Sequence, residues 1–206
     1  MSKVEPPGIF INCPFDTAYK PIFDAIIFAM FDCGYVPRGA LEAVDSAEAR
    51  LSKLLRIIWE CDFAVHDISR IELDRDSGLP RFNMPFELGL YLGAREFGGG
   101  RHRRKICLIL DKDRYRFQKF LSDIAGQDIT AHRGKPENAV HAIRNWLSAS
   151  TGVIVPGAQH VWRRYLAFKK DLPALAREAK LKVSEIQFAD RRKLIEIWLK
   201  RFESVV

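Results

Sequence analysis

The stretch AEARLSKLLRIIWECDFAVHDIS, residues 47–69, decides the fold class because two hydrophobic periods meet in it. In its first part, leucine and isoleucine recur at the three- and four-residue spacing of an amphipathic helix, for which we expect Ser46 as the N-cap. The second part is a short apolar run that ends in polar residues, as a buried strand does at the edge of a sheet. A helix followed directly by a buried strand is the repeating unit of α/β proteins.

The same alternation continues in both directions along the chain. The further segments are the strand-like GIFINCPF (8–15), a helical pattern that ends at Gly34, the weaker strand YVPRGALEA (35–43), the helical RFNMPFELGLYLGA (81–94), the apolar strand KICLILD (105–111), the short strand DITAH (128–132) and the helical PENAVHAIRNWLSAS (136–150) with Pro136 in its first turn. This order predicts an α/β domain over residues 8–150, with a flavodoxin-like, doubly wound parallel sheet of about five strands.

A C-terminal helical appendage is expected over residues 160–206, after the linker-like TGVIVPGAQ (151–159). Pro173 and residues 182–184 predict breaks between two or three helices. The segment is too short for a core of its own, so we expect it to pack on the main domain or on a second copy.

The net charge of +7 belongs mainly to this appendage. Residues 160–206 hold twelve of the 33 Lys and Arg residues but six of the 26 Asp and Glu residues, which leaves residues 1–159 nearly neutral with 21 against 20. Basic residues interleaved with aromatic ones are one signature of nucleic-acid binding. Aromatic residues at helical spacing also form core-facing stripes with a solvated, charged opposite side, and we favour packing or homo-oligomer formation through these helices.

Composition excludes several classes of protein. No apolar run approaches the roughly 18 residues that span a bilayer, and residues 1–7 lack the pattern of a secretory signal, so we expect a cytoplasmic protein without membrane contact. The four cysteines are far apart and favour buried thiols over a zinc site or disulfides. No glycine-rich phosphate loop occurs, which argues against a dinucleotide redox enzyme or an NTPase.

Candidate binding residues follow from the rule that ligands of parallel sheets bind beyond the carboxyl ends of the strands. The arginines among them could bind phosphate bidentately, although loop arginines are commonly just solvated. The candidates at the strand ends and in the loop that leads into the third helical segment are Asn12, Phe15, Asp16, Arg38, Asp67, Ser69, Arg81 and Asn83.

Glu87 is the candidate catalytic residue. With Asn83 as the N-cap, Glu87 falls in the first turn of a helix that is otherwise apolar, where the helix N-terminus keeps a carboxylate ionised. An ionised carboxylate at a pocket suits attack on a sugar C1 that develops positive charge. Plain helix capping is the alternative. Gly89 and Gly93 weaken the helix unless a strand or a ligand approaches them closely.

Two neighbouring residues carry open alternatives. Asp67 could cap the loop after its strand together with Ser69, or it could hold hydroxyl groups or a base of a ligand. His66 follows an apolar strand and faces away from Asp67, which favours a buried core histidine over a catalytic base.

The segment CDFAVHDIS (61–69), followed by NMPFELGLYLGA (83–94) and KICLILD (105–111), resembles the nucleoside 2-deoxyribosyltransferase-like and TIR-like superfamily. There, a strand that ends in Asp-x-Ser precedes a helix with a Phe-Glu-Leu-Gly motif. The opening IFINCPFDTAYKPIFDAI (9–26) is similar to the first strand and loop, which line the sugar and base site in that superfamily. The resemblance covers residues 8–147, and FELG is its sharp motif.

This resemblance implies that Glu87 matches the catalytic glutamate, which is a nucleophile at the sugar C1 in the transferases and is required to cleave the nicotinamide–ribose bond of NAD in TIR proteins. Asp67 would match the acidic residue at the end of the third strand, and Asn12, Phe15 and Asp16 would occupy first-loop positions. The lead into the helix, RFNMP, differs from that of the transferases, and the tryptophan–cysteine signature of TIR proteins is missing, so the substrate stays open.

We therefore expect N-glycosidic-bond cleavage of a nucleotide, and specifically NAD hydrolysis with release of nicotinamide, as used in bacterial antiviral defence. NAD is the expected substrate, with no cofactor and no metal. A nucleoside 2-deoxyribosyltransferase or nucleotide hydrolase is one alternative, and a non-catalytic nucleotide-sensing and signalling module is another. Because a second subunit completes the pocket in related proteins, the tail helices would serve a homo-oligomer. We do not expect nucleic acid as a partner.

Overall fold

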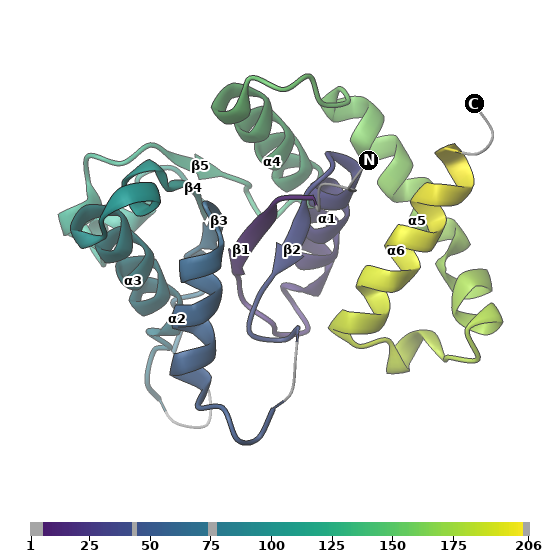
Figure 1. The fold of residues 1–206 in the computed structure, drawn as a ribbon, viewed down its shortest axis with the longest axis horizontal. Helices are drawn as coiled ribbons and strands as arrows, with labels where there is room; N and C mark the ends of the chain where they lie inside the picture. The colour runs from purple at the N-terminus through teal and green to yellow at the C-terminus, as the bar shows by residue number, and fades with distance from the viewer. Residues whose placement is uncertain (1–5, 43–44, 74–77, 204–206) are drawn as a thin grey trace.

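A computed structural model describes residues 6–42, 45–73 and 78–203 and contains one sheet of five parallel strands (Figure 1). The strand order is β2-β1-β3-β4-β5, and the chain order therefore reverses between β1 and β3. This order confirms the doubly wound α/β prediction and is that of flavodoxin-like folds. The strands are β1 (Gly8–Asn12), β2 (Val36–Arg38), β3 (Phe63–Asp67), β4 (Ile106–Asp111) and β5 (Ile129–Ala131).

In the described ranges, six α-helices cover the sheet and extend beyond it (Figure 1). They are α1 (Lys20–Asp32), α2 (Arg50–Glu60), α3 (Asn83–Phe97), α4 (Pro136–Thr151), α5 (Ala158–Glu178) and α6 (Phe188–Glu203), with short 3-10 turns at η1 (Gly100–Arg104), η2 (Arg116–Lys119), η3 (Ser122–Ile124) and η4 (Val183–Glu185). Gly34 follows α1 with a φ of 86°, and Pro136 begins α4, both as the sequence predicts.

Strand side chains alternate between two cores, one on each face of the sheet. Ile9, Ile11 and Val65 point into a large core shared with α1 and α4. Phe10 and Ala64 point to the opposite face and pack against α2 and α3. This alternation follows from the two-residue period of a strand, and it places neighbouring polar residues at the strand ends on opposite faces as well.

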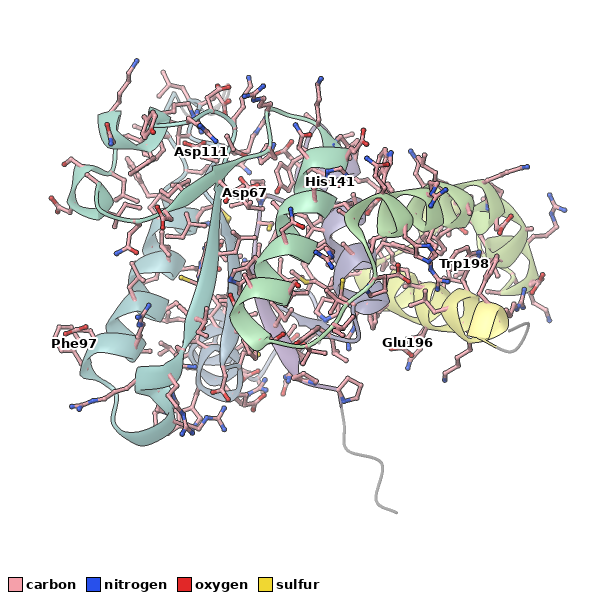
Figure 2. All side chains as sticks on the ribbon, turned by 90° about the horizontal axis from the view of Figure 1, so that it is seen from above. Asp67, Phe97, Asp111, His141, Glu196 and Trp198 are labelled. Atoms are coloured by element: carbon pink, nitrogen blue, oxygen red, sulfur yellow. The ribbon has the colours of Figure 1, made fainter. Side chains whose placement is uncertain are left out.

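Helices α5 and α6 pack on α1 and extend its core, and in Figure 2 Trp198 lies between these two helices. Trp198 is 2% exposed, contacts the rings of Phe28 and Phe168, and donates a 2.9 Å hydrogen bond to Asp171. The aromatic stripe of the appendage is therefore used within its own chain. This confirms the packing interpretation.

Two sequence-based helix boundaries are wrong. The N-cap of α2 is Ala49 and not Ser46, because the segment before it forms a turn. Helix α5 also continues through Pro173, since burial of Leu172 and Leu175 on either side holds the helix together. The expected break at residues 182–184 is present between α5 and α6.

In the part of the chain that the structure describes, no helix is long and apolar enough to cross a membrane. Residues 1–5, which include most of the N-terminal segment considered for a secretory signal, lie outside the described residues.

The buried position of Trp198 predicts a large stability effect. We expect Trp198→Ala to lower the free energy of unfolding by about 3 to 5 kcal/mol, because it removes a whole aromatic side chain from the core. The adjacent Ile197→Ala, at a side chain that is 43% exposed, should cost less than about 1 kcal/mol. Urea unfolding followed by circular dichroism measures both, and equal costs would show that the appendage is not part of the cooperative core.

Candidate functional site

The carboxyl ends of β1 and β3 meet where the chain order reverses, and Asn12 ties this edge to α3. The Asn12 amide nitrogen donates a 2.8 Å hydrogen bond to the carbonyl oxygen of Met84 in the first turn of α3. The same nitrogen lies 3.0 Å from Nδ1 of His66. Since Met84 can only accept, the orientation of the Asn12 amide is settled, and among the described residues its Oδ1 atom accepts no hydrogen bond.

His66 is a buried core histidine, in agreement with the interpretation that we favoured. It is 0% exposed and lies edge-on to the rings of Phe10 and Tyr91. Burial lowers the pKa of His66 to about 3, so the imidazole is neutral at physiological pH. Because Nδ1 accepts from Asn12, the ring proton resides on Nε2, and the residue is not available as a general base.

Asp67 lies on the other face of β3 in a buried polar cluster. The Tyr19 hydroxyl donates to its Oδ2 at 2.5 Å, and the Ser69 backbone N–H donates to its Oδ1 at 2.8 Å. Nε2 of His132 lies 3.1 Å from Oδ2, and Nδ1 of the same ring accepts from the Gly134 N–H at 2.9 Å. Asp67 is 0% exposed and therefore serves to hold the loops together, with Ser69 capped through its backbone.

Cys13 lies beside this cluster and is not a nucleophile in this environment. Its thiol is 0% exposed. Burial, and secondarily the charge of Asp67, raise the pKa of the Cys13 thiol well above its ordinary value. The charge of Glu87 acts in the same direction.

Glu87 lies in the second turn of α3, not the first. Helix α3 begins at Asn83, its N-cap is Phe82, and no side chain caps it. The expected capping role of Asn83 is therefore wrong, and plain capping does not explain Glu87. Its carboxyl group is instead directed inward, because the residue is 5% exposed on a helix whose buried residues are Glu87, Leu88 and Tyr91.

The environment of Glu87 changes its protonation. Burial raises the pKa of Glu87 to about 7, and the nearby charge of Arg50 opposes this shift. The raised pKa of Glu87 argues against the expectation of a carboxylate that is fully ionised at neutral pH. A carboxyl group balanced in this way can act either as a base or nucleophile, or as an acid.

The outer face of α3 is exposed, although the sequence of this helix is largely apolar. Phe86 and Phe97 are 53% and 90% exposed. Gly89 and Gly93 lie on this side as well, and a Cβ atom at Gly89 would meet nothing within 4 Å. Among the described residues, no strand makes the expected close approach to the two glycines.

A cleft of about 770 Å³ opens beside the start of α3. Its size is in the usual range for small-molecule sites. The residues that line it are Pro14, Phe15, Asp16, Arg50, Arg70, Glu72, Leu73, Arg81, Asn83 and Met84. Glu87 follows Met84 by three residues on α3, so it lies on the same side of the helix, one turn further from the cleft.

The structure brings four of the predicted binding residues together in this cleft, namely Phe15, Asp16, Arg81 and Asn83. Asn12, Asp67 and Ser69 lie at the same edge of the sheet but are buried at 1%, 0% and 3% exposure. Their side chains serve to support the cleft.

Arg38 is the predicted residue that the structure places elsewhere. Its guanidinium bonds Glu42 at 2.6 and 2.8 Å and Glu60 at 2.9 Å, and it does not line the cleft. These bonds, with Glu42 the largest contribution, raise the pKa of Arg38. The expected phosphate contact of Arg38 therefore has no support, because the carboxylates of Glu42 and Glu60 already compensate its charge.

Arg50 is the functional candidate that sequence reasoning missed. It is the first residue of α2, it lines the cleft, and its charge acts on Glu87. A signal existed, because the helices of a parallel α/β sheet start at the edge where the strands end. The first turn of each helix therefore faces the same crevice as the strand ends.

No group of three or more His, Cys, Asp or Glu side chains within the described ranges is placed to hold a metal ion. No family model, curated protein or solved structure matches this chain. The assignment of function therefore rests on the geometry of the cleft and on the chemistry of Glu87.

The pKa of Glu87 predicts a pH-dependent stability. The folded protein holds the proton more tightly than the unfolded chain, whose glutamate has its ordinary value of 4.5. The resulting stabilisation is fully present below pH 4.5 and is lost as the pH rises through about 7, with a total of about 3 kcal/mol. Glu87→Gln should lack this loss, whereas Glu96→Gln at an exposed position should keep it. Urea unfolding between pH 5 and 8 makes the comparison, and identical pH profiles for wild type and Glu87→Gln would contradict it.

The open surroundings of Gly89 predict that alanine is tolerated there. We expect Gly89→Ala to raise the free energy of unfolding by about 0.5 to 1 kcal/mol, because alanine favours the helix and its methyl group meets no neighbour. Thermal unfolding at low protein concentration measures the effect. Destabilisation by this variant would reveal a contact at Gly89 outside the chain.

Proposed function

We propose that the protein cleaves the N-glycosidic bond of a nucleotide, and that NAD is its substrate. The observation that carries the proposal is the buried carboxyl group of Glu87, which has a pKa of about 7 and lies next to an arginine-lined cleft at the reversal of the strand order. The resemblance of the FELG segment to the deoxyribosyltransferase-like and TIR-like superfamily supports the same residue.

At the reacting carbon, the protein must stabilise the positive charge that develops during bond cleavage. The bond between the ribose C1 and the nicotinamide nitrogen breaks, and its electron pair leaves with the nitrogen, which loses its positive charge. Ionised Glu87 stabilises the positive charge that develops at C1, or bonds to that carbon. The oxygen of a water molecule then attacks C1 and loses a proton, which gives nicotinamide and ADP-ribose.

The cleft supplies groups that suit a dinucleotide. Arg50, Arg70 and Arg81 line it, and planar guanidinium groups bind phosphate oxygens bidentately. Arg70 is shared with Asp16 at 3.3 Å and Glu72 at 3.6 Å, so a phosphate would compete with these partly exposed carboxylates. Phe15, at 42% exposure, offers a ring for stacking.

A second function has support in one observation. Glu87 is 5% exposed, the Asn12 amide nitrogen already donates within the protein, and both carboxylate oxygens of Asp67 accept hydrogen bonds there. A nucleotide-sensing module that binds without turnover would show this arrangement. Deoxynucleosides as substrates would instead place the protein with the deoxyribosyltransferases, because the same carboxylate serves both reactions.

Our proposal for the cellular context rests on the resemblance to the superfamily alone. It suggests a cytoplasmic enzyme that depletes NAD in bacterial antiviral defence. A homo-oligomer through α5 and α6 remains part of this proposal, although those helices bury most of their apolar side chains against α1. Leu166 and Ile197, at 45% and 43% exposure, are among the apolar residues that they leave for such a contact.

Glu87→Gln tests the proposal directly. We expect wild type to release nicotinamide from NAD during overnight incubation, and Glu87→Gln to lose at least about a hundredfold in rate, because a neutral amide cannot stabilise the developing cation. Glu96→Gln on the same helix is the matched control and should retain activity. Chromatography of the products distinguishes nicotinamide from the bases that a parallel deoxynucleoside mixture would release, and full activity of Glu87→Gln would exclude the mechanism.

The pH dependence provides a separate check. Because Glu87 must be ionised to support a cation, kcat/KM for NAD should rise with pH and level off, with a midpoint near 7. A profile that is flat from pH 5 to 8 would show that Glu87 does not titrate in the rate-determining step.

A further inference from the structure

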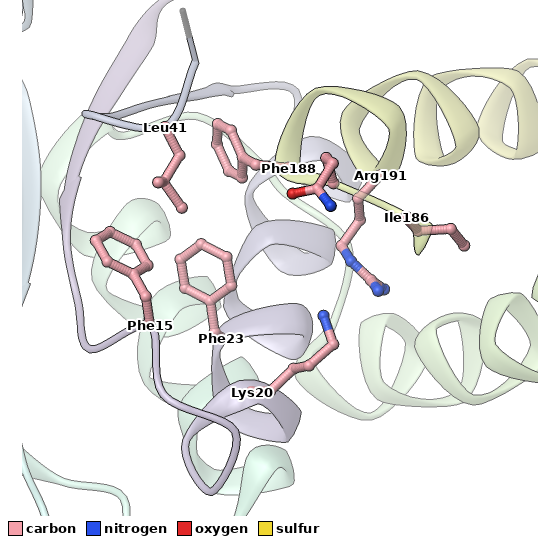
Figure 3. A pocket seen from close by; sticks show the side chains of 8 residues that line it. Phe15, Lys20, Phe23, Leu41, Ile186, Phe188 and Arg191 are labelled. Carbon is pink, nitrogen blue, oxygen red and sulfur yellow. The ribbon is translucent and has the colours of Figure 1, made fainter. Parts of the chain in front are cut away.

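The N-terminus of α6 closes a second pocket next to the candidate cleft (Figure 3). The pocket has a volume of about 180 Å³ and lies between the β1–α1 loop, the start of α1, the segment after β2 and the start of α6. The C-terminal appendage is thus part of its wall, through Ile186, Gln187, Phe188 and Arg191.

One side of this tail pocket is aromatic and aliphatic. Figure 3 shows Phe15, Phe23, Phe188 and Leu41 gathered there. The ring centroids of Phe15 and Phe23 are 5.4 Å apart, and those of Phe23 and Phe188 are 5.9 Å apart. Phe15 and Leu41 are still 42% and 39% exposed, so the contact between the appendage and the domain leaves this apolar surface open.

The other side of the pocket is cationic. In Figure 3 the side chains of Lys20 and Arg191 extend toward each other across it. Both approach the same carboxylate, Asp24, at 3.6 Å for Lys20 and 3.0 Å for Arg191. Two positive charges share one negative charge, which leaves a surplus that an anion can satisfy. The Lys20 side chain is 51% exposed and can turn toward a ligand, whereas the Arg191 side chain is 6% exposed.

The tail pocket adjoins the candidate cleft. Phe15 lines both of them. A neighbouring hollow of about 580 Å³ shares Leu41 and Phe188 with the tail pocket and Arg50 with the cleft. A ligand longer than one nucleotide can therefore extend from the cleft to α6 without leaving the protein surface.

We propose that the tail pocket binds the second nucleotide of a dinucleotide, with its aromatic base among Phe15, Phe23 and Phe188 and its phosphate at Lys20. That the dinucleotide is the substrate rests on the proposed function, whereas the binding of a base and a phosphate rests on the pocket alone. The appendage then has a task in substrate recognition, because Phe188 belongs to α6.

Binding of AMP by the full chain, measured by calorimetry, tests the pocket without any need for catalysis. We expect saturable binding by wild type and about a tenfold or larger loss in Phe188→Ala, since the stacking ring is gone. Phe188→Tyr retains the ring and should restore the affinity, which separates recognition from folding. The control Phe97→Ala removes an exposed phenylalanine from α3 and should bind AMP as wild type does.

Lys20→Gln tests the proposed contact between Lys20 and the phosphate group of the ligand. It should weaken AMP about tenfold and leave the weaker binding of adenosine unchanged, because one charge-assisted contact is lost. Unchanged AMP affinity in both Phe188→Ala and Lys20→Gln, or no saturable AMP binding by wild type, would overturn the proposal.

Turnover separates this proposal from the proposed function. Phe188→Ala should raise KM for NAD about tenfold and leave KM for nicotinamide mononucleotide, which lacks the second nucleotide, unchanged. If wild type binds AMP but does not cleave NAD, and Phe188→Ala loses AMP binding, the proposed pocket is upheld and the proposed hydrolase activity is refuted. NAD cleavage with the same KM in Phe188→Ala and wild type would refute the pocket and uphold the hydrolase.

Discussion

The buried carboxylate of Asp67 is the constraint on which the candidate site depends. A charge without solvent requires partners, and Asp67 obtains them from Tyr19 at the start of α1, from Ser69 after β3 and from His132 after β5. Three separate loops are thereby drawn to the carboxyl end of β3. Figure 2 shows Asp67 at the same end of the sheet as Asp111, which Arg116 bonds at 2.5 and 3.0 Å. Arg116 also donates to the Ser69 carbonyl at 2.7 Å, which adds a fourth loop.

At this edge, polar residues on the two faces of the sheet have different roles. Asp67 points toward α1 and anchors loops, while Asn12 and His66 point toward α3 and attach the first turn of that helix. Glu87 follows one turn later and so is held relative to β1 by the Asn12–Met84 bond. Because burial disfavours its charged form, the pKa of Glu87 is raised to about 7. A layer of buried polar residues thus lies beneath the groups that line the cleft and supports them.

The appendage stabilises the core next to α1, and it also lines the tail pocket. Its aromatic stripe completes the core beyond α1, and its basic residues include Arg164 and Arg191, which pair with Asp32 at 2.8 Å and Asp24 at 3.0 Å. The cationic character that suggested nucleic-acid binding is therefore partly spent on the domain itself. The appendage still exposes apolar side chains such as Leu166 and Ile197. More strongly exposed ones lie on the domain, with Trp59 on α2 and Phe97 on α3 at 63% and 90% exposure.

The sequence by itself determined the α/β class, the parallel sheet, the inward position of His66 and the gathering of Phe15, Asp16, Arg81 and Asn83, because hydrophobic period and strand ends are local properties. It did not determine that Arg38 is compensated by Glu42 and Glu60, that Asp67 is enclosed, or that Glu87 lies in the second turn with a raised pKa. Those features depend on which distant side chains and how much water surround each group. Burial and pairing of that kind arise only when the tertiary structure brings the segments together.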